Sequence, residues 1–222
     1  MKQFVRDHVE FFRQYVRQFE TTGAVAPSSR SLARAMTRPL CACRDRDVRI
    51  LEVGPGTGAV TREIVRHVKP GDTFDLVEIN AEFANLMRKR FETQPHYRTV
   101  AERSTVHVCP LQEFEPEGRY DVIISGLPFN NFPSTLVEEL LDVCLELLNP
   151  GGTLSFFEYM YIRPLRRMVS RSEEKTRLGE IEGILQSRFA DHRFDTDWVF
   201  VNVPPAWVQH LRVGQPETGG RK

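Results

Sequence analysis

LEVGPGTG, residues 51–58, decides the fold of this chain. It joins an apolar run that begins at Val48 to a segment, residues 61–68, with the periodicity of a helix. Three glycines at alternate positions let the backbone turn sharply and let a ligand approach it closely. Glu78 stands twenty residues after Gly58, at the end of the next predicted strand. A carboxylate there can accept two hydrogen bonds from a ribose. Strand, turn, helix and acid together predict a nucleoside-binding site.

Short apolar runs alternate with helical segments around this turn. The predicted strands are 48–53, 73–79, 104–109, 120–125, 153–159 and 198–203, the last closed by Pro204-Pro205, with the final ten residues beyond it. The predicted helices are 30–37, capped by Ser28 or Ser29, then 61–68, 80–92, 134–148 and 164–189, the last basic at its start. Such alternation predicts βαβ units and a parallel sheet covered on both faces. We therefore expect an α/β fold with a doubly wound, mostly parallel, Rossmann-like sheet that contains these six strands.

Residues 2–20 form a second distinctive segment. At 100° per residue, its aromatic and aliphatic side chains fall on one helical face and its charges on the other. This amphipathic helix either lies on an anionic membrane surface or packs onto the core. We divide the chain into an N-terminal helical extension, 1–40, which covers a membrane or a substrate, and a main domain, 41–222.

Composition excludes several classes of protein. The 222 residues include 30 basic and 30 acidic side chains, and this zero formal charge argues against a general nucleic-acid binder. No apolar stretch is long enough to span a bilayer, and charges interrupt the N-terminus where a signal peptide has its apolar core. The four cysteines lack CxxC spacing and the six histidines are scattered, so we predict no metal site. A cytoplasmic protein, peripheral at the membrane, is expected.

The glycine turn fits two nucleoside cofactors. Gly54, Gly56 and Ala59 satisfy the dinucleotide pattern GxGxx(G/A). The form ExGxGxG, with Glu52 and Gly58, resembles motif I of class I S-adenosylmethionine (SAM) methyltransferases. An acid beside the turn suits a cationic amino acid better than an anionic pyrophosphate. The resemblance implies a seven-stranded sheet, one strand more than the pattern shows. It also implies Glu52 near the methionine ammonium and Glu78 on the ribose. The predicted SAM-binding residues are Glu52, Gly54, Gly56, Gly58, Glu78, Ile79, Gln112 and Ser125.

The loop after the fourth predicted strand points to the methyl acceptor. Amino-methylating members of the class hold an (N/D)PP(Y/F) or NLP(Y/F) sequence there, whereas this chain has SGLPFNN, 125–131, with Gly126 at the amide position. GAVAPSS, SGLPFNN and FFEYMYIRPLRR together resemble bacterial phospholipid N-methyltransferases, over about residues 23–167. The third strand of such enzymes usually runs into an Asp that binds the adenine amino group. Here Cys109-Pro110-Leu111-Gln112 has none, and Gln112 is the expected substitute.

This resemblance implies N-methylation of phosphatidylethanolamine-type lipids. Such a displacement needs a neutral amine held in line with the sulfonium methyl, and a group that takes a proton. Glu158 and Tyr159 are the predicted catalytic residues, and the predicted substrate-binding residues are Phe129, Asn130, Tyr161, Arg163 and Arg167. Arg163 and Arg167, four residues apart, would bind the lipid phosphate. Ordinary packing, or a solvated helix face, explains these side chains equally well.

Three other functions stay open. The NLP(Y/F)-like loop also resembles rRNA adenine N6-dimethyltransferases, but those enzymes carry a helical RNA-binding domain after the catalytic fold. About twenty residues follow the last predicted strand here, and the net charge is zero. A small-molecule or protein N-methyltransferase is the second alternative, and a SAM-binding protein without catalysis is the third. Nucleic acid is the less expected partner, and the oligomeric state is open.

Overall fold

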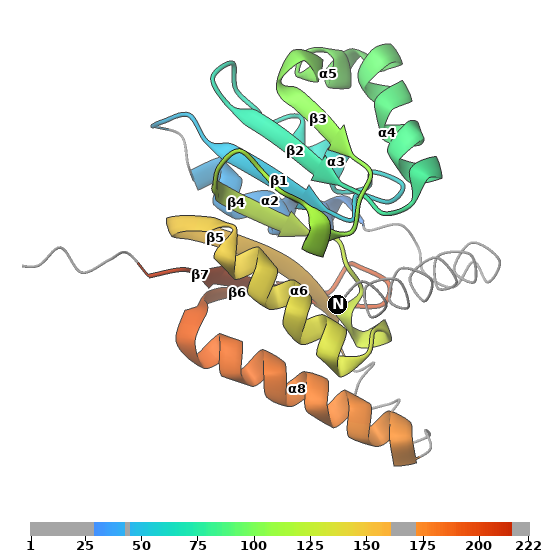
Figure 1. Ribbon diagram of the computed structural model, residues 1–222, viewed down its shortest axis with the longest axis vertical. Coiled ribbons are helices and arrows are strands. Elements are labelled where there is room, and N and C mark those ends of the chain that lie inside the picture. Colours follow the sequence, from blue (N-terminus) through green and yellow to red (C-terminus); the bar gives the residue numbers. More distant parts are fainter. Residues whose placement is uncertain (1–28, 43–44, 161–171, 215–222) are drawn as a thin grey trace, which may run out of the picture.

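The computed structural model describes residues 29–42, 45–160 and 172–214 (Figure 1). Its strands form one seven-stranded sheet in the order β3-β2-β1-β4-β5-β7-β6. They are β1 (Arg49–Val53), β2 (Thr73–Val77), β3 (Ser104–His107), β4 (Tyr120–Ser125), β5 (Leu148–Tyr159), β6 (Arg193–Val199) and β7 (Ala206–Arg212). All neighbouring pairs are parallel except β5–β7 and β6–β7. The predicted α/β fold is confirmed.

Helices cover both faces of the sheet. Those described are α2 (Arg30–Ala42), α3 (Thr61–Ile64), α4 (Ala81–Thr93), α5 (Pro95–Arg98), α6 (Ser134–Glu146) and α8 (Ser172–His192). One core cluster joins the sheet to α2, α3, α4 and α5, and a second joins its other face to α6 and α8. In Figure 1, α6 and α8 run side by side in front of the sheet and α2 lies behind it. Both faces of the central strands are therefore buried, which explains their unbroken apolar runs.

The helix α2 belongs to the core of the fold. Ser29 caps it, because the Ser29 Oγ accepts a hydrogen bond from Leu32 N at 3.1 Å, as predicted. Leu32, Met36 and Leu40 are fully or almost fully buried against the sheet. The helix runs to Ala42, beyond the predicted end at residue 37, and the proposed domain boundary at 40/41 falls inside it. The predicted amphipathic helix 2–20 lies outside the described residues.

The C-terminal strands differ from the prediction. WVFVNV, 198–203, is not a strand of its own: Trp198 and Val199 end β6, and residues 200–205 connect it to β7. Pro204-Pro205 thus precede a strand rather than close the last one. The strand β7 escaped prediction because it contains Gln209 and His210, which are polar but buried. Their partners come from neighbouring strands, and sequence alone does not show them.

The partners of His210 form a polar network that runs from the buried side of the sheet to the exposed surface of α2. The Ser155 Oγ lies 2.8 Å from His210 Nδ1, and His210 Nε2 lies 3.1 Å from Asp197 Oδ2. Arg38 donates from Nε to Asp197 at 2.7 Å and from Nη2 to Asp195 at 2.7 Å. The order resembles a serine-hydrolase triad, but Ser155 and His210 are completely buried. Burial also lowers the pKa of His210. The network therefore fastens α2 to β5, β6 and β7.

Several other predicted elements have different bounds: α3 ends at Ile64 rather than residue 68, β2 at Val77 rather than 79, and β3 at His107 rather than 109. The predicted helix 134–148 ends at Glu146, and β5 already begins at Leu148, with a register irregularity opposite Tyr120 and Val122. In the described ranges, no helix is both long and apolar enough to cross a membrane.

Candidate active site

The glycine turn between β1 and α3 leaves one open position. Gly54, Gly56 and Gly58 have φ angles of 67°, 51° and 72°, in the left-handed region that favours glycine. A Cβ on Gly54 would come within 2.7 Å of the Leu127 side chain, and one on Gly58 would collide with the side chains of Arg90 and Met87. A Cβ on Gly56 would meet nothing within 4 Å. The positive φ favours glycine at all three positions; Gly54 and Gly58 face neighbouring side chains, whereas the space beside Gly56 is open.

Glu78 holds this turn from the end of β2. Its Oε2 accepts a hydrogen bond from Gly56 N at 3.0 Å, and its Oε1 accepts one from Asn80 N at 2.9 Å. Burial raises the pKa of the Glu78 carboxyl, and the backbone hydrogen bonds oppose that rise. Each carboxylate oxygen keeps a second lone pair, which a ligand hydroxyl can use. The predicted ribose-binding acid therefore lies beside the glycine turn, fixed in place.

Glu52 lies beneath the turn and is 1% exposed. Its Oε2 has no hydrogen-bond partner among the described residues. Burial, with a smaller repulsion from Glu78, raises the pKa of the Glu52 carboxyl to about 8, against an opposing hydrogen bond with Thr61. The side chain therefore keeps its proton at neutral pH. A cation arriving beside it would favour the charged form.

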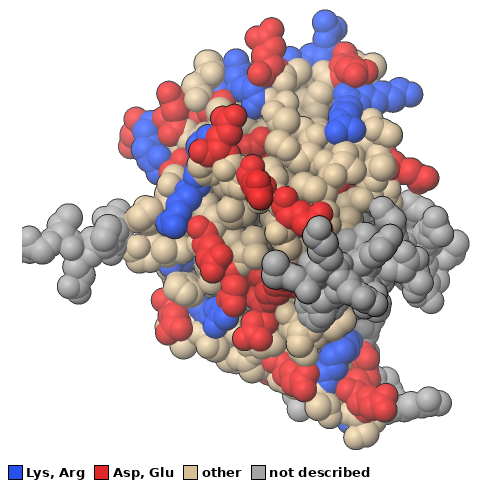
Figure 2. Space-filling view, viewed as in Figure 1, with Lys and Arg blue, Asp and Glu red and all other residues tan. Residues whose placement is uncertain are grey.

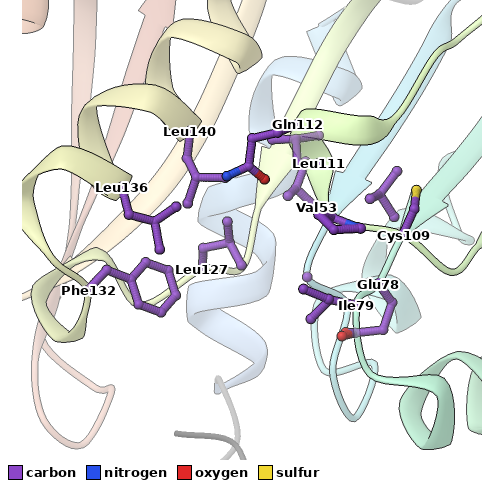
Figure 3. Close-up of a pocket in the computed structure, with 13 residues that line it drawn as sticks. Val53, Glu78, Ile79, Cys109, Leu111, Gln112, Leu127, Phe132, Leu136 and Leu140 are labelled. Carbon is purple, nitrogen blue, oxygen red and sulfur yellow. The ribbon is translucent and has the colours of Figure 1, made fainter. Parts of the chain in front are cut away.

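A half-open pocket, called the cavity below, adjoins the turn (Figure 3). Gly54, Glu78, Ile79 and Gln112 line it, so it brings together four of the eight predicted cofactor residues. Its other lining residues are apolar or nearly so: Val53, Val77, Cys109, Pro110, Leu111, Leu127, Phe132, Leu136 and Leu140. In Figure 3, Glu78 and Ile79 lie on one side, with Leu136, Leu140 and Phe132 on the other. Such an apolar slot with a few polar groups fits a heteroaromatic ring.

Gln112 is the residue predicted to substitute for the adenine-binding Asp that is absent after the third strand. It lies in the short 3₁₀ turn Leu111–Glu113, and its Nε2 donates to Glu139 Oε2 of α6 at 3.2 Å. This bond orients the Gln112 amide at the wall of the cavity. Glu139, which holds it, is a residue that the sequence analysis did not single out. Glu139 lies 27 residues from Gln112 on a helix with several other acidic residues, so the sequence gives no signal that the two side chains are in contact.

The loop after β4 passes very close to the glycine turn. Gly126 N donates to Val53 O at 2.8 Å, and a Cβ on Gly126 would stand 2.7 Å from the Gly54 carbonyl oxygen. A glycine here, in place of the amide found in related loops, is therefore a packing requirement. Ser125 is completely buried beside Val53 in the sheet register and is not part of the cavity lining.

The acceptor-side residues are divided among several places. Phe129 is buried against Phe156, with ring centroids 5.2 Å apart. Asn130 is 8% exposed, and its Oδ1 has no hydrogen-bond partner among the described residues. Glu158 Oε2 accepts a hydrogen bond from Gln209 at 3.1 Å.

Glu158 and Tyr159 point to opposite faces of β5. Glu158 lines a groove with residues of α8, whereas Tyr159 packs into the cluster on the α2 face. They therefore do not converge on one point. Tyr161, Arg163 and Arg167 lie outside the described residues.

Comparison with known proteins agrees with this geometry. A family model described as a methyltransferase domain matches residues 51–154, which run from within β1, across the glycine turn, to within β5. The chain is a SAM-dependent methyltransferase. Its methyl donor is S-adenosylmethionine. The open position at Gly56, the buried Glu78 and the apolar slot fit that cofactor, and the dinucleotide alternative is set aside.

Relatives and solved structures extend the comparison. The methyltransferase is 28% identical over 166 residues, 73% of this chain and 85% of the relative, to the ornithine lipid N-methyltransferase of Singulisphaera acidiphila. It is 33% identical over 122 residues to the highly reducing polyketide synthase ctvA of Aspergillus terreus, of which it spans 5%. Among solved structures, an O-methyltransferase from Bacillus cereus in complex with SAH has a TM-score of 0.62 at 15% identity, covering 95% of this chain and 96% of that one. The N-methyltransferase NodS from Bradyrhizobium japonicum WM9 has a TM-score of 0.58 at 14% identity, covering 82% and 94%.

Proposed function

We propose that this enzyme transfers a methyl group from SAM to the amine of a phosphatidylethanolamine-type phospholipid. The observation that supports a lipid amine is the match to an ornithine lipid N-methyltransferase over 73% of the chain. That relative also makes the amine of an ornithine lipid a second candidate acceptor. Both acceptors present an amine at the surface of a membrane lipid, so the same site serves either.

The residues that line the cavity support an assignment of the parts of SAM that they would contact. Glu78 would hold the ribose hydroxyls, the apolar slot beside Ile79 the adenine, and Gln112 its amino group. Glu52 would face the methionine ammonium from beneath the turn. When bound, SAM supplies an electrophilic methyl group on a sulfonium.

The acceptor end rests on Asn130 and Glu158. The Asn130 Oδ1 is a buried acceptor without a described partner, in the 3₁₀ turn that follows β4. An amine N–H is the donor that it would receive. Glu158, buried at the carboxyl end of β5, is our proposed proton acceptor, and Gln209 holds its carboxylate in place. The rate then comes from positioning a desolvated amine, with little further covalent chemistry for the protein to perform.

Asn130→Ala tests this assignment. We expect kcat/KM on lipid vesicles to fall about 10- to 100-fold, the value of a hydrogen bond to a charged group, with SAM affinity unchanged. Asn131→Ala, the same change one position along, is the matched control. The readout is transfer of radiolabelled methyl from SAM. Equal activity in both variants would remove Asn130 from the site.

The acceptor class is tested with the wild-type enzyme. Vesicles of phosphatidylethanolamine, vesicles of an ornithine lipid, free ethanolamine and rRNA are offered separately, with labelled SAM. We expect label in lipid. Label in RNA or in free ethanolamine alone would refute the proposed function.

A further inference from the structure

The connection between β6 and β7 exposes large apolar side chains. Trp198, Phe200, Val201 and Val203 are 60%, 63%, 72% and 76% exposed, more than any other large apolar side chain of the described residues. We call residues 198–203 the apolar tip. Single exposed apolar residues are ordinary, but four of them within six positions form a patch. No charged residue occurs from Trp198 to Gln209, in a chain with 27% charged residues.

The apolar tip is a formed surface. The Asn202 side chain is buried, accepts from Ser29 N at 3.1 Å and donates to the Pro204 carbonyl at 2.7 Å. Met160 N donates to the Pro205 carbonyl at 2.7 Å, which ties the connection to the end of β5. The exposure of Phe200 and Val203 is therefore built into a loop with its own hydrogen bonds.

The apolar tip lies at the edge of the sheet that binds ligands. Val53, Ser125 and Phe156 stand side by side in the register of β1, β4 and β5. Three residues further along β5, Tyr159 pairs with Ala206, which also pairs with Val199 at the end of β6. At about 3.3 Å per residue, Val199 lies about 10 Å beyond that row, and residues 200–203 of the tip follow it. Figure 1 shows the β6–β7 connection emerging on the side toward which the arrows of β1 to β4 point.

We propose that the apolar tip docks on a lipid bilayer and turns the active-site edge toward the membrane. This inference rests on the lipid acceptor proposed above. Tryptophan and phenylalanine favour the membrane interface, and an uncharged tip enters it without desolvating a charge.

The charges around the tip agree with this orientation. Arg34 of α2 lines a groove with Phe200 and Val201; its side chain lies 3.6 Å from Glu63 but is 66% exposed, so it can still meet anionic headgroups. Acidic side chains instead gather over α6 and α8 (Figure 2), and that face would be repelled by an anionic surface. A bilayer would thus meet the sheet edge rather than the α6–α8 face.

Vesicle sedimentation of the full chain tests the docking. In Phe200→Ser/Val201→Ser/Val203→Ser, we expect partitioning onto phosphatidylethanolamine–phosphatidylglycerol vesicles to fall at least tenfold, with SAM affinity unchanged. Phe194→Ser is the matched control, because Phe194 is also exposed (41%) but lies at the opposite end of β6. Its partitioning should stay within twofold of wild type. Wild-type partitioning by the triple variant would overturn the proposal.

Tryptophan quenching gives a second measurement. Trp198 and Trp207 are the two tryptophans of the chain, so Trp207→Phe leaves Trp198 as the reporter. Brominated lipids in the vesicles should quench its emission. The alternative is that residues 1–28 cover the tip. In that case the Trp198 emission would not change when vesicles are added, but it would shift when residues 1–28 are deleted. That result would overturn the proposal.

Activity on the same vesicles separates this inference from the proposed function. The triple variant should methylate lipid in vesicles at least tenfold more slowly than wild type, and detergent-dispersed lipid at the wild-type rate. Vesicle binding by wild type without methyl transfer would refute the lipid acceptor and leave the docking standing. Unimpaired methylation of vesicles by the triple variant would refute the docking and leave the acceptor standing.

Discussion

Glu52→Gln should make the enzyme more stable at neutral and alkaline pH. The Glu52 carboxyl is 1% exposed and has a pKa of about 8, against an ordinary value of 4.5. Between these two values the folded chain holds a proton that the unfolded chain has lost. The free energy of unfolding therefore falls as pH rises, by about 1.4 kcal/mol per pH unit. Glutamine keeps the shape of the protonated acid and removes this dependence.

The quantity predicted is the difference in the free energy of unfolding between Glu52→Gln and wild type. It should be small near pH 5 and reach about 3–4 kcal/mol near pH 7.5, a large part of the stability of a typical domain. Urea unfolding from pH 5 to pH 8 measures it. The matched control is Glu115→Gln, the same change at an exposed position. Wild-type and Glu52→Gln profiles that run parallel across this range would refute the reasoning.

Cofactor binding extends the same prediction. If the methionine ammonium lies beside Glu52, it favours the charged carboxylate, and binding then releases a proton near pH 7. Calorimetry in buffers of different ionisation enthalpy detects that proton. Glu52→Gln should bind SAM without releasing it. Equal proton release in both proteins would place the ammonium elsewhere.

Three further changes test the glycine turn and its acid. Gly56→Ala should cost about 1–2 kcal/mol of stability, from its positive φ alone, yet greatly weaken SAM binding in calorimetry, because the new methyl group fills open space at the turn. Gly126→Ala should lower both the unfolding temperature and SAM affinity, since its Cβ would stand 2.7 Å from the Gly54 carbonyl; unchanged values would contradict the close approach. Glu78→Gln should weaken SAM binding by about 1.5–3 kcal/mol, measured by the same titration, and wild-type affinity would exclude it from the ribose site.

Local patterns were sufficient for the first half of the fold. Residues 120–125 were predicted as a strand and form β4 with those bounds, because strands buried on both faces read as unbroken apolar runs. The glycine turn was equally readable, since positive φ angles at Gly54, Gly56 and Gly58 require a residue type that the sequence shows directly. Glu78 was identified as the acid beside the turn because it stands at the end of the second predicted strand.

Contacts between distant segments decided the rest. The strand β7 contains Gln209 and His210, and these polar residues interrupt the apolar pattern by which a buried strand is recognised. They are buried because Glu158 and Ser155 of β5 lie within hydrogen-bond distance of them, a pairing that only the fold shows. The apolar wall of the cavity comes from α6, and Gln112 is fixed by Glu139, 27 residues away. Such pairings depend on how layers stack, and spacing along the chain does not encode them.

The sequence by itself determined the α/β class, the glycine turn and the acid that closes it, because each depends on the properties of single residues and of short periods. The tertiary structure alone decided that Gly126 must pass the Gly54 carbonyl and that Glu158 and Tyr159 lie on opposite faces of β5. It also decided that WVFVNV leaves the sheet after Val199. Phe200, Val201 and Val203 continue the apolar pattern of a strand. Only the pairing of β6 with β7, which ends at Val199 and Ala206, shows that no neighbour remains for them.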